Sequence, residues 1–221
     1  MSIVNLKNAF IYQDDFLVLE DVSFNLNEGE FCYLIGDTGS GKSSLLKTMY
    51  AELPLKKGEG EVSGHNLNKI KNKNIPFLRR KIGIVFQDFQ LLNDRSVKDN
   101  LSFVLNSIGY NNEKEILNII NQSLSKVKML NHINKMPHEL SGGEQQKICI
   151  ARSIINNPKL ILADEPTGNL DPNTTKEIMM LLKEISKNGT AILMATHEKN
   201  IIKEFPSRMI ECKDKKLINH N

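Results

Sequence analysis

The stretch 36–43 combines glycines, a lysine and a hydroxyl group in the pattern G-x-x-x-x-G-K-[ST]. Glycines let the backbone curl so that several N–H groups point at one anion, and the amino end of a following helix adds to that attraction. We therefore expect a nucleotide phosphate site, with Lys42 at the β- and γ-phosphates and the Ser43 hydroxyl as a ligand of Mg²⁺. The stretch consists of Gly36, Asp37, Thr38, Gly39, Ser40, Gly41, Lys42 and Ser43.

Two adjacent carboxylates, Asp164 and Glu165, follow the apolar run 160–163. Ligands of parallel sheets collect at the carboxyl ends of the strands, so we expect both acids at that edge. Asp164 is suited to hold a metal, and Glu165 to polarise a water for in-line attack on a γ-phosphate. Paired acids before a proline such as Pro166 also act as plain helix caps, so the pair indicates chemistry only together with the phosphate loop.

The segment 140–146, Leu-Ser-Gly-Gly-Glu-Gln-Gln, opens a helical pattern. Its serine and glycine N–H groups form an anion site at a helix start, with no nucleotide of its own to bind. The segment resembles the signature motif of the ABC family of ATPases. That resemblance implies that Ser141, Gly142, Gly143 and Glu144 complete the ATP pocket of a second copy, in a head-to-tail homodimer.

Other positions resemble the ABC pattern in chain order. Gln87 resembles the glutamine that meets the metal and the attacking water, and His197 resembles the histidine that contacts the γ-phosphate and orients the water. The stretch 168–171 resembles the loop that crosses the dimer. The resemblance thus implies a Mg²⁺-dependent ATPase with Glu165, His197 and Gln87 as catalytic residues, and Ser43, Gln87 and Asp164 as metal ligands.

Tyr12 resembles the aromatic residue that stacks on adenine in this family. Phe10 and Phe16 lie close to it in the sequence, and any of the three could instead belong to the core. Ser44 stands where the family usually has threonine, and Asp37 where proline is common. Neither change removes a catalytic group, so we expect an active ATPase that is slow when isolated.

The stretch 85–97, with an aspartate after Gln87 and the pair Asp94-Arg95, is most similar to the FtsE-type branch, the cell-division ATP-binding proteins of bacteria. This implies an integral membrane partner of the FtsX type, permease-like in build, docked near 88–96. The alternative is the branch that serves lipoprotein release or macrolide export, because its 168–171 segment is the same.

The order of elements predicts an α/β fold. Buried strands are expected at 31–35, 82–86, 160–163, 190–195 and 208–212, with a helical region over 96–157 between them. The resemblance implies a P-loop NTPase of the ABC type, with a RecA-like α/β core, an antiparallel β subdomain and an inserted α-helical subdomain. We expect one domain over 1–221, with the core at about 1–87 and 158–221 and the helical subdomain at about 88–157.

Composition limits the other function classes. A net charge of +3 in 221 residues is weak for a nucleic-acid binder, and the dispersed Cys32, Cys149 and Cys212 fit a reducing compartment. No signal peptide and no apolar run of membrane-spanning length is visible, so we expect a peripheral protein at the cytoplasmic face of the bacterial cell membrane. A soluble ABC protein of ribosomes or DNA, and a scaffold that uses ATP only as a dimerisation switch, remain the rival hypotheses.

Overall fold

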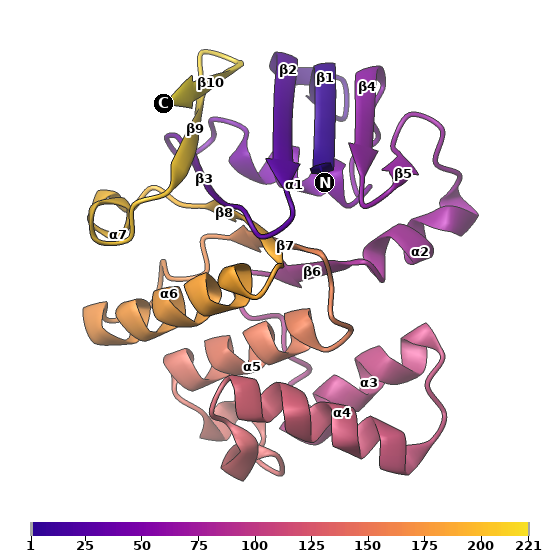
Figure 1. Cartoon of the computed structure of the whole chain (residues 1–221), viewed down its shortest axis with the longest axis vertical. Helices are drawn as coiled ribbons and strands as arrows, with labels where there is room; N and C mark the ends of the chain where they lie inside the picture. The colour runs from indigo at the N-terminus through magenta and orange to yellow at the C-terminus, as the bar shows by residue number, and fades with distance from the viewer. Residues whose placement is uncertain (1, 221) are drawn as a thin grey trace.

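A six-stranded sheet lies at the centre of the fold (Figure 1). The computed structural model describes residues 2–220. The strand order is β10-β9-β3-β8-β7-β6, and all neighbouring strands are parallel except β10 and β9. The carboxyl ends of the parallel strands therefore meet at one edge. The strands are β3 (Phe31–Ile35), β6 (Ile82–Val85), β7 (Leu160–Asp164), β8 (Ala191–Ala195), β9 (Arg208–Lys213) and β10 (Lys216–His220).

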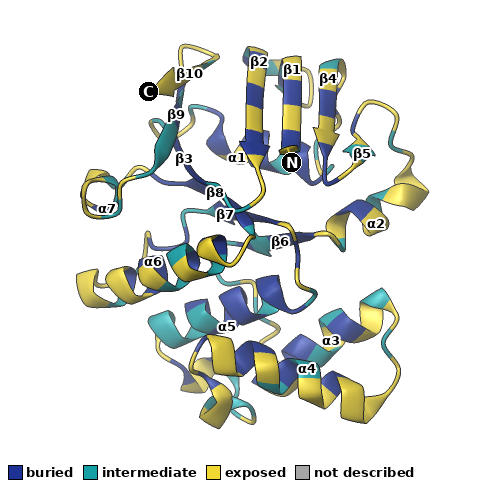
Figure 2. Ribbon diagram, in the orientation of Figure 1, coloured by how far each residue is buried: buried dark blue, intermediate teal, exposed yellow. Residues whose placement is uncertain are grey.

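The central strands are apolar throughout because both faces of the sheet are covered. Successive residues point to opposite faces, so Cys32 and Leu34 belong to one hydrophobic cluster and Tyr33 to another. All five residues of β8 are buried, and Figure 2 shows the centre of the molecule as largely buried. Burial on both faces fixes where each strand ends, and with it the residues that follow.

A four-stranded antiparallel sheet and one helix cover the first face. The sheet has the order β2-β1-β4-β5 and lies at the top of Figure 1. Apolar side chains of this sheet and of α1, including Leu6, Leu45 and Met49, form one cluster with Leu162 of β7. The elements are β1 (Ser2–Gln13), β2 (Phe16–Asn27), β4 (Lys57–Val62), β5 (His65–Asn66) and α1 (Lys42–Met49).

Helices cover the second face. Between β6 and β7 the chain forms α3 (Val97–Ile108), α4 (Glu113–Lys126) and α5 (Gly142–Ile154), which lie at the bottom of Figure 1. Helices α6 (Pro172–Lys187) and α7 (Lys199–Glu204) follow β7 and β8. Helix α2 (Ile75–Arg79) precedes β6, and its Leu78 belongs instead to the cluster of the first face. Along residues 2–220, no helix is both long and apolar enough to span a membrane.

The start of each longer helix carries a side-chain cap. Ser96 caps α3, Asn112 caps α4, Ser141 caps α5 and Asp171 caps α6, each accepting a backbone N–H bond from the first turn. At the other end of α5, a methyl group on Gly83 of β6 would lie only 2.4 Å from the Ser153 carbonyl oxygen. The last turn of α5 therefore packs directly on the central sheet.

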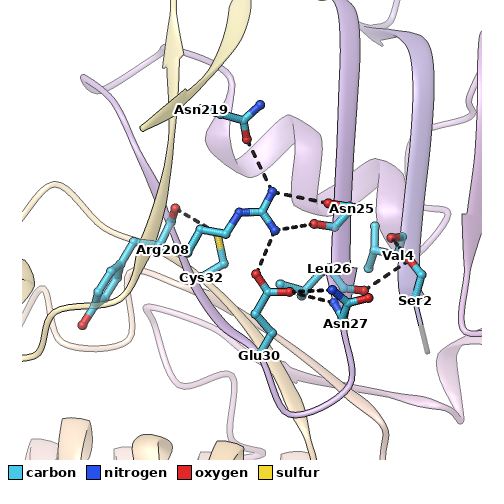
Figure 3. Close-up of polar contacts among 10 residues, drawn as sticks. Ser2, Val4, Asn25, Leu26, Asn27, Glu30, Cys32, Arg208 and Asn219 are labelled. Carbon is cyan, nitrogen blue, oxygen red and sulfur yellow. Dashed lines mark hydrogen bonds and ion pairs between the residues drawn. The ribbon is translucent and has the colours of Figure 1, made fainter. Parts of the chain in front are cut away.

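Arg208, at the start of β9, connects the two sheets (Figure 3). Its guanidinium group donates to the Asn25 carbonyl of β2 at 2.8 Å and to Glu30 Oε1 at 2.8 Å. A longer bond of 3.4 Å reaches Asn219 Oδ1 of β10. Glu30 Oε2 in turn accepts the Asn27 N–H at 2.9 Å, so one ion pair fixes the chain reversal between β2 and β3.

Candidate ATP site

The glycine-rich loop connects the end of β3 to the start of α1. Gly36 and Gly41 have φ of 142° and 104°, a backbone region that favours glycine. A methyl group on Gly36 would lie 2.5 Å from the Cys212 carbonyl oxygen, so only glycine fits between the loop and β9. The Lys42 ammonium donates to the Gly36 carbonyl at 2.7 Å and to the Asp37 carbonyl at 3.1 Å, and it is buried. The Lys42 side chain therefore lies across the opening of the loop that precedes it.

The loop has the features of an anion cradle. Asp37, Thr38 and Gly39 are exposed, which leaves the outer side of the loop open to a ligand. The Ser40 hydroxyl is buried without a hydrogen-bond partner in the described chain, although buried polar groups are nearly always paired. Ser44 is different, because its buried hydroxyl donates to Gln13 Oε1 of β1 at 3.4 Å.

The acid pair stands at the end of β7 with two different environments. Burial raises the pKa of Asp164, and a hydrogen bond from Ser43 opposes that rise only in part. Ser43 and Asp164 are thus in contact, and hydroxyl and carboxylate oxygens are the donors that Mg²⁺ prefers. Among residues 2–220 no group of three acidic, cysteine or histidine side chains is arranged to hold a metal ion by itself, so a metal here would draw on Ser43, Asp164, an amide oxygen and the phosphates.

Glu165 lies between Lys42 and His197. One carboxylate oxygen is 3.6 Å from Lys42 Nζ and the other is 3.1 Å from His197 Nδ1. The Glu165 N–H donates to the Ala195 carbonyl of β8 at 3.0 Å, and its φ is 45°, which is strained for a residue with a side chain. The neighbouring strand therefore holds Glu165 in a turn that points its carboxylate at the phosphate loop.

Gln87 reaches the same place from the end of β6. A methyl group on Gly168 would lie 3.5 Å from Gln87 Nε2 and 3.8 Å from Glu165 Oε2. The Gln87 and Glu165 side chains therefore both lie beside Gly168. Gln87 also lines a cavity of about 500 Å³ together with Asp164. Residues from four parallel strand ends thus converge on one site.

Tyr12 lies near the end of β1 with a half-buried ring, 5.6 Å from the ammonium group of Lys56. Its neighbour Gln13 accepts the Ser44 hydroxyl, which brings this end of β1 to the first turn of α1. A methyl group on Gly41 would lie 2.7 Å from Val18 of β2, so the β1–β2 hairpin borders the phosphate loop. Phe10 and Phe16 differ from Tyr12: a lysine covers the Phe10 ring at 3.8 Å, and Phe16 is 80% exposed.

The segment Ser141–Glu144 forms the start of α5, apart from the phosphate loop. Ser141 and Glu144 cap each other: Glu144 Oε2 accepts the Ser141 N–H at 2.8 Å, and the Glu144 N–H donates to Ser141 Oγ at 3.3 Å. The Ser141 N–H holds the pKa of Glu144 below its usual value, and His132 Nε2 is 3.1 Å from the same carboxyl group. Within residues 2–220 no hydrogen bond or ion pair joins this segment to the phosphate loop.

Three residues that line the site were not predicted from the sequence. Lys47 in the last turn of α1, and Tyr50 and Glu52 just after it, line the cavity beside Gln87 and Asp164. A hydrogen bond from Tyr50 to Glu52 at 2.9 Å and an ion pair between Lys47 and Glu52 at 3.0 Å connect the three. Nothing in their spacing distinguishes them from ordinary helix residues, so no sequence signal could have found them.

Comparisons with known proteins agree with this geometry. The model of the ABC transporter family matches residues 19–168. The cell division ATP-binding protein FtsE of Streptococcus pneumoniae is 42% identical over 99% of this chain and 95% of its own, and that of Bacillus subtilis is 42% identical over 96% and 92%. FtsE of Escherichia coli is 41% identical over 89% of this chain and 88% of its own.

Solved structures of similar chains are ATP-binding cassettes. The dimeric, post-hydrolysis ATP-binding cassette MJ0796, bound to ADP and Pi, has a TM-score of 0.85 and 33% identity over 97% of this chain and 96% of its own. Both the expected α/β cassette fold and the expected ATPase class are thereby confirmed. The chain belongs to the ABC transporter family of ATPases and, within it, to the FtsE family of cell division ATP-binding proteins.

Proposed function

We propose that this ATPase works as a head-to-tail dimer with ATP between the subunits, and that it drives an FtsX-type membrane protein in bacterial cell division. The placement of Glu165 between Lys42 and His197, at the edge where four strands end, carries the proposal. It puts a carboxylate beside a lysine that faces phosphates and beside a histidine that can hold a water. The names of the FtsE relatives and the dimeric MJ0796 structures support the biological setting.

In the proposed site each side chain has one task. Lys42 exchanges the Gly36 and Asp37 carbonyls for the β- and γ-phosphates, which the backbone of the stretch 36–43 and the Ser40 hydroxyl surround. Ser43, Asp164 and Gln87 would hold Mg²⁺, which neutralises phosphate charge when it is bound. The hydrogen bond from Ser44 to Gln13 joins the first turn of α1 to the end of β1, where Tyr12 stacks on the adenine.

Hydrolysis then depends on two groups. Glu165 takes the proton of a water aligned with the γ-phosphate, and His197 holds that water and the Glu165 carboxylate in place. Because Lys42 already lies 3.6 Å from Glu165, the transferred phosphoryl group would lie within reach of both.

The second copy supplies what one chain lacks. The N–H groups of Gly142 and Gly143 at the start of α5, with the Ser141 hydroxyl, would bind the γ-phosphate held by the partner, and Glu144 shapes that surface through its cap on Ser141. ATP then joins the two subunits, and hydrolysis releases them.

The membrane partner would dock beside the stretch 88–96. A cavity of about 430 Å³ adjoins it through Arg152, which donates to the Gln90 carbonyl, and three arginines without any acid line this cavity: Arg79, Arg80 and Arg152. Such a surface suits an apolar segment that carries carboxylates. Movement of the helical unit, about 88–157, would transmit dimer closure to a partner in the cell membrane, with this chain at its cytoplasmic face.

The variant Glu165→Gln tests the proposal. We expect turnover to fall by about 10²-fold or more, because the general base is lost while ATP binding is kept, and we expect an ATP-dependent dimer in analytical ultracentrifugation. Glu177→Gln, on the exposed side of α6, is the matched control. Tagged Glu165→Gln, isolated with ATP from solubilised membranes of the native host, should retain an FtsX-type protein.

A monomeric Glu165→Gln with normal turnover would refute the proposed mechanism. Recovery of a lipoprotein-release or macrolide-export type partner would instead support the alternative membrane role.

A further inference from the structure

The chain makes a strained turn directly after Gln87. Phe89 and Gln90 have φ of 60° and 48°, and the Gln90 N–H donates to the Asp88 carbonyl at 2.6 Å. A three-residue turn with positive φ at its centre is a rare and strained conformation for residues with side chains. Such a turn persists only where its surroundings hold it.

Two side chains of α5 hold this turn. Arg152 donates to the Phe89 carbonyl at 2.7 Å and to the Gln90 carbonyl at 2.5 Å. Cys149 donates to the Phe89 carbonyl at 3.0 Å, and burial raises the pKa of its thiol to about 12, so the donor proton stays in place. Hydrogen bonds from a charged group are about twice as strong as neutral ones, and the rigid guanidinium fork fits two adjacent carbonyls.

The turn also touches the signature segment at the start of α5. A methyl group on Gly142 would lie 3.8 Å from Cζ of Phe89 and 3.7 Å from Cδ2 of Leu170. The Phe89 ring therefore packs over the glycine that precedes Gly143, beside the 168–171 loop. One short turn thus links Gln87 to both Arg152 and Gly142.

We propose that Arg152 is a positioning residue, which holds the turn at Phe89 and Gln90 and thereby aligns Gln87 in its own ATP site and Ser141–Glu144 toward the partner's site. This inference rests on the roles proposed above for Gln87 and the signature segment. Arg152 touches neither the nucleotide nor the reacting atoms in this arrangement; it acts through two backbone carbonyls. Its loss releases the strain of the turn and lets Gln87 move away from Glu165.

The test compares Arg152→Met, Arg152→Lys and the control Lys147→Met. Lys147 lies on the same helix α5 and pairs with Glu177 at 2.6 Å, but makes no hydrogen bond with the turn. We expect Arg152→Met to lower kcat by about tenfold to a hundredfold, the scale of a small misplacement of a catalytic group, with KM for ATP within about twofold. The Mg²⁺ concentration for half-maximal rate should rise. Arg152→Lys should recover part of kcat, and Lys147→Met should behave as the wild type.

A second, structural measurement is alkylation of Cys149 in the folded chain, followed by mass spectrometry. Opening of the turn should expose Cys149 to the alkylating reagent in Arg152→Met. Cys32 should stay unmodified, because it is buried in β3, which is not part of the turn. All rates are measured below the unfolding temperature of each variant. If Arg152→Met does not fold, Arg152→Lys and Phe89→Leu decide by the same kcat and Mg²⁺ readouts.

Wild-type kcat and Mg²⁺ dependence in folded Arg152→Met would overturn the inference and leave the proposed function intact. A fall in thermal stability alone, with kcat unchanged, would do the same, since it assigns Arg152 a purely structural role. A wild-type chain without ATP turnover would instead overturn the proposed function, and this inference with it.

Discussion

The charged form of Asp164, at the end of β7, opposes folding at neutral pH. Burial raises its pKa above the value in the unfolded chain, because the charged form loses hydration. The folded state therefore holds this proton more tightly than the unfolded state does. Its contribution to stability is complete below the unfolded pKa and is lost as the pH rises through the folded pKa. A metal bound at this site would offset that loss.

The variant Asp164→Asn should accordingly unfold at a higher temperature than the wild type at pH 7 without metal, while ATP turnover is lost. Each 1 kcal/mol gained raises Tm by about 2–4 °C in a domain of this size. Scanning calorimetry at pH 7 and at a series of lower pH values measures the effect, and the gain should shrink as the pH falls and Asp164 takes up its proton.

Asp171→Asn is the control with the opposite sign. Hydrogen bonds from Thr174 hold the pKa of Asp171 below its usual value, so removal of this charge should lower Tm at pH 7. A lower Tm for Asp164→Asn at neutral pH would contradict the argument that burial dominates at that position.

At the scale of elements, most of the predicted strands and helices follow from local sequence patterns. The apolar run 160–163 became β7, and the strand expected at 31–35 is β3 (Phe31–Ile35), because burial on both faces of a sheet appears in the sequence as a continuous apolar run. Strand β10 was missed, since an exposed edge strand such as Lys216–His220 has almost no apolar signal. The resemblance implied an antiparallel β subdomain, but its strand order β2-β1-β4-β5 needed the structure, because pairing is set by distant contacts.

The candidate site, too, was predicted from the sequence only in part. Motif residues such as Lys42, Glu165 and His197 were predicted and lie together, while their roles remain predictions. Short α2 (Ile75–Arg79) and the turn at Phe89 were not predicted, since the conformation of the turn depends on Arg152 from another helix. Side chains that bind backbone carbonyls leave no pattern in the sequence around the carbonyl.

Asn100 of α3 gives a prediction at this scale, because one buried amide holds the whole loop 92–96. It accepts the Leu92 N–H at 2.8 Å and donates to the carbonyls of Leu92, Arg95 and Ser96 at 3.0–3.1 Å. Asn100→Leu should lower the free energy of unfolding by about 2–4 kcal/mol, since several backbone groups lose their partner. Unfolding in urea measures this loss of free energy.

The control is Asn106→Leu, at an exposed position on the same helix, and it should change the free energy of unfolding by less than about 0.5 kcal/mol. Equal stability of the two variants would refute this role.

At the scale of the whole molecule, the active site depends on two sheets that keep a fixed relation. Tyr12 belongs to the antiparallel sheet, whereas Lys42 and Glu165 follow strands of the central sheet. Besides the shared hydrophobic cluster, Arg208 connects the two sheets at the amino ends of β9 and β3. Because parallel strands place amino and carboxyl ends at opposite edges, this connection is remote from the phosphate loop.

Arg208→Met should therefore separate stability from ATP binding. It leaves the Glu30 carboxylate without its cation and the Asn25 carbonyl without its strongest donor, so we expect a loss of about 1–3 kcal/mol in urea unfolding. The pair is partly exposed, which keeps the loss below that of a buried ion pair. A double-mutant cycle with Glu30→Gln isolates the pair, and KM for ATP should stay within about twofold because the carboxyl edge is untouched. A large rise in KM at unchanged stability would show that the sheets are connected mainly at the ATP site, contrary to the role assigned here to Arg208.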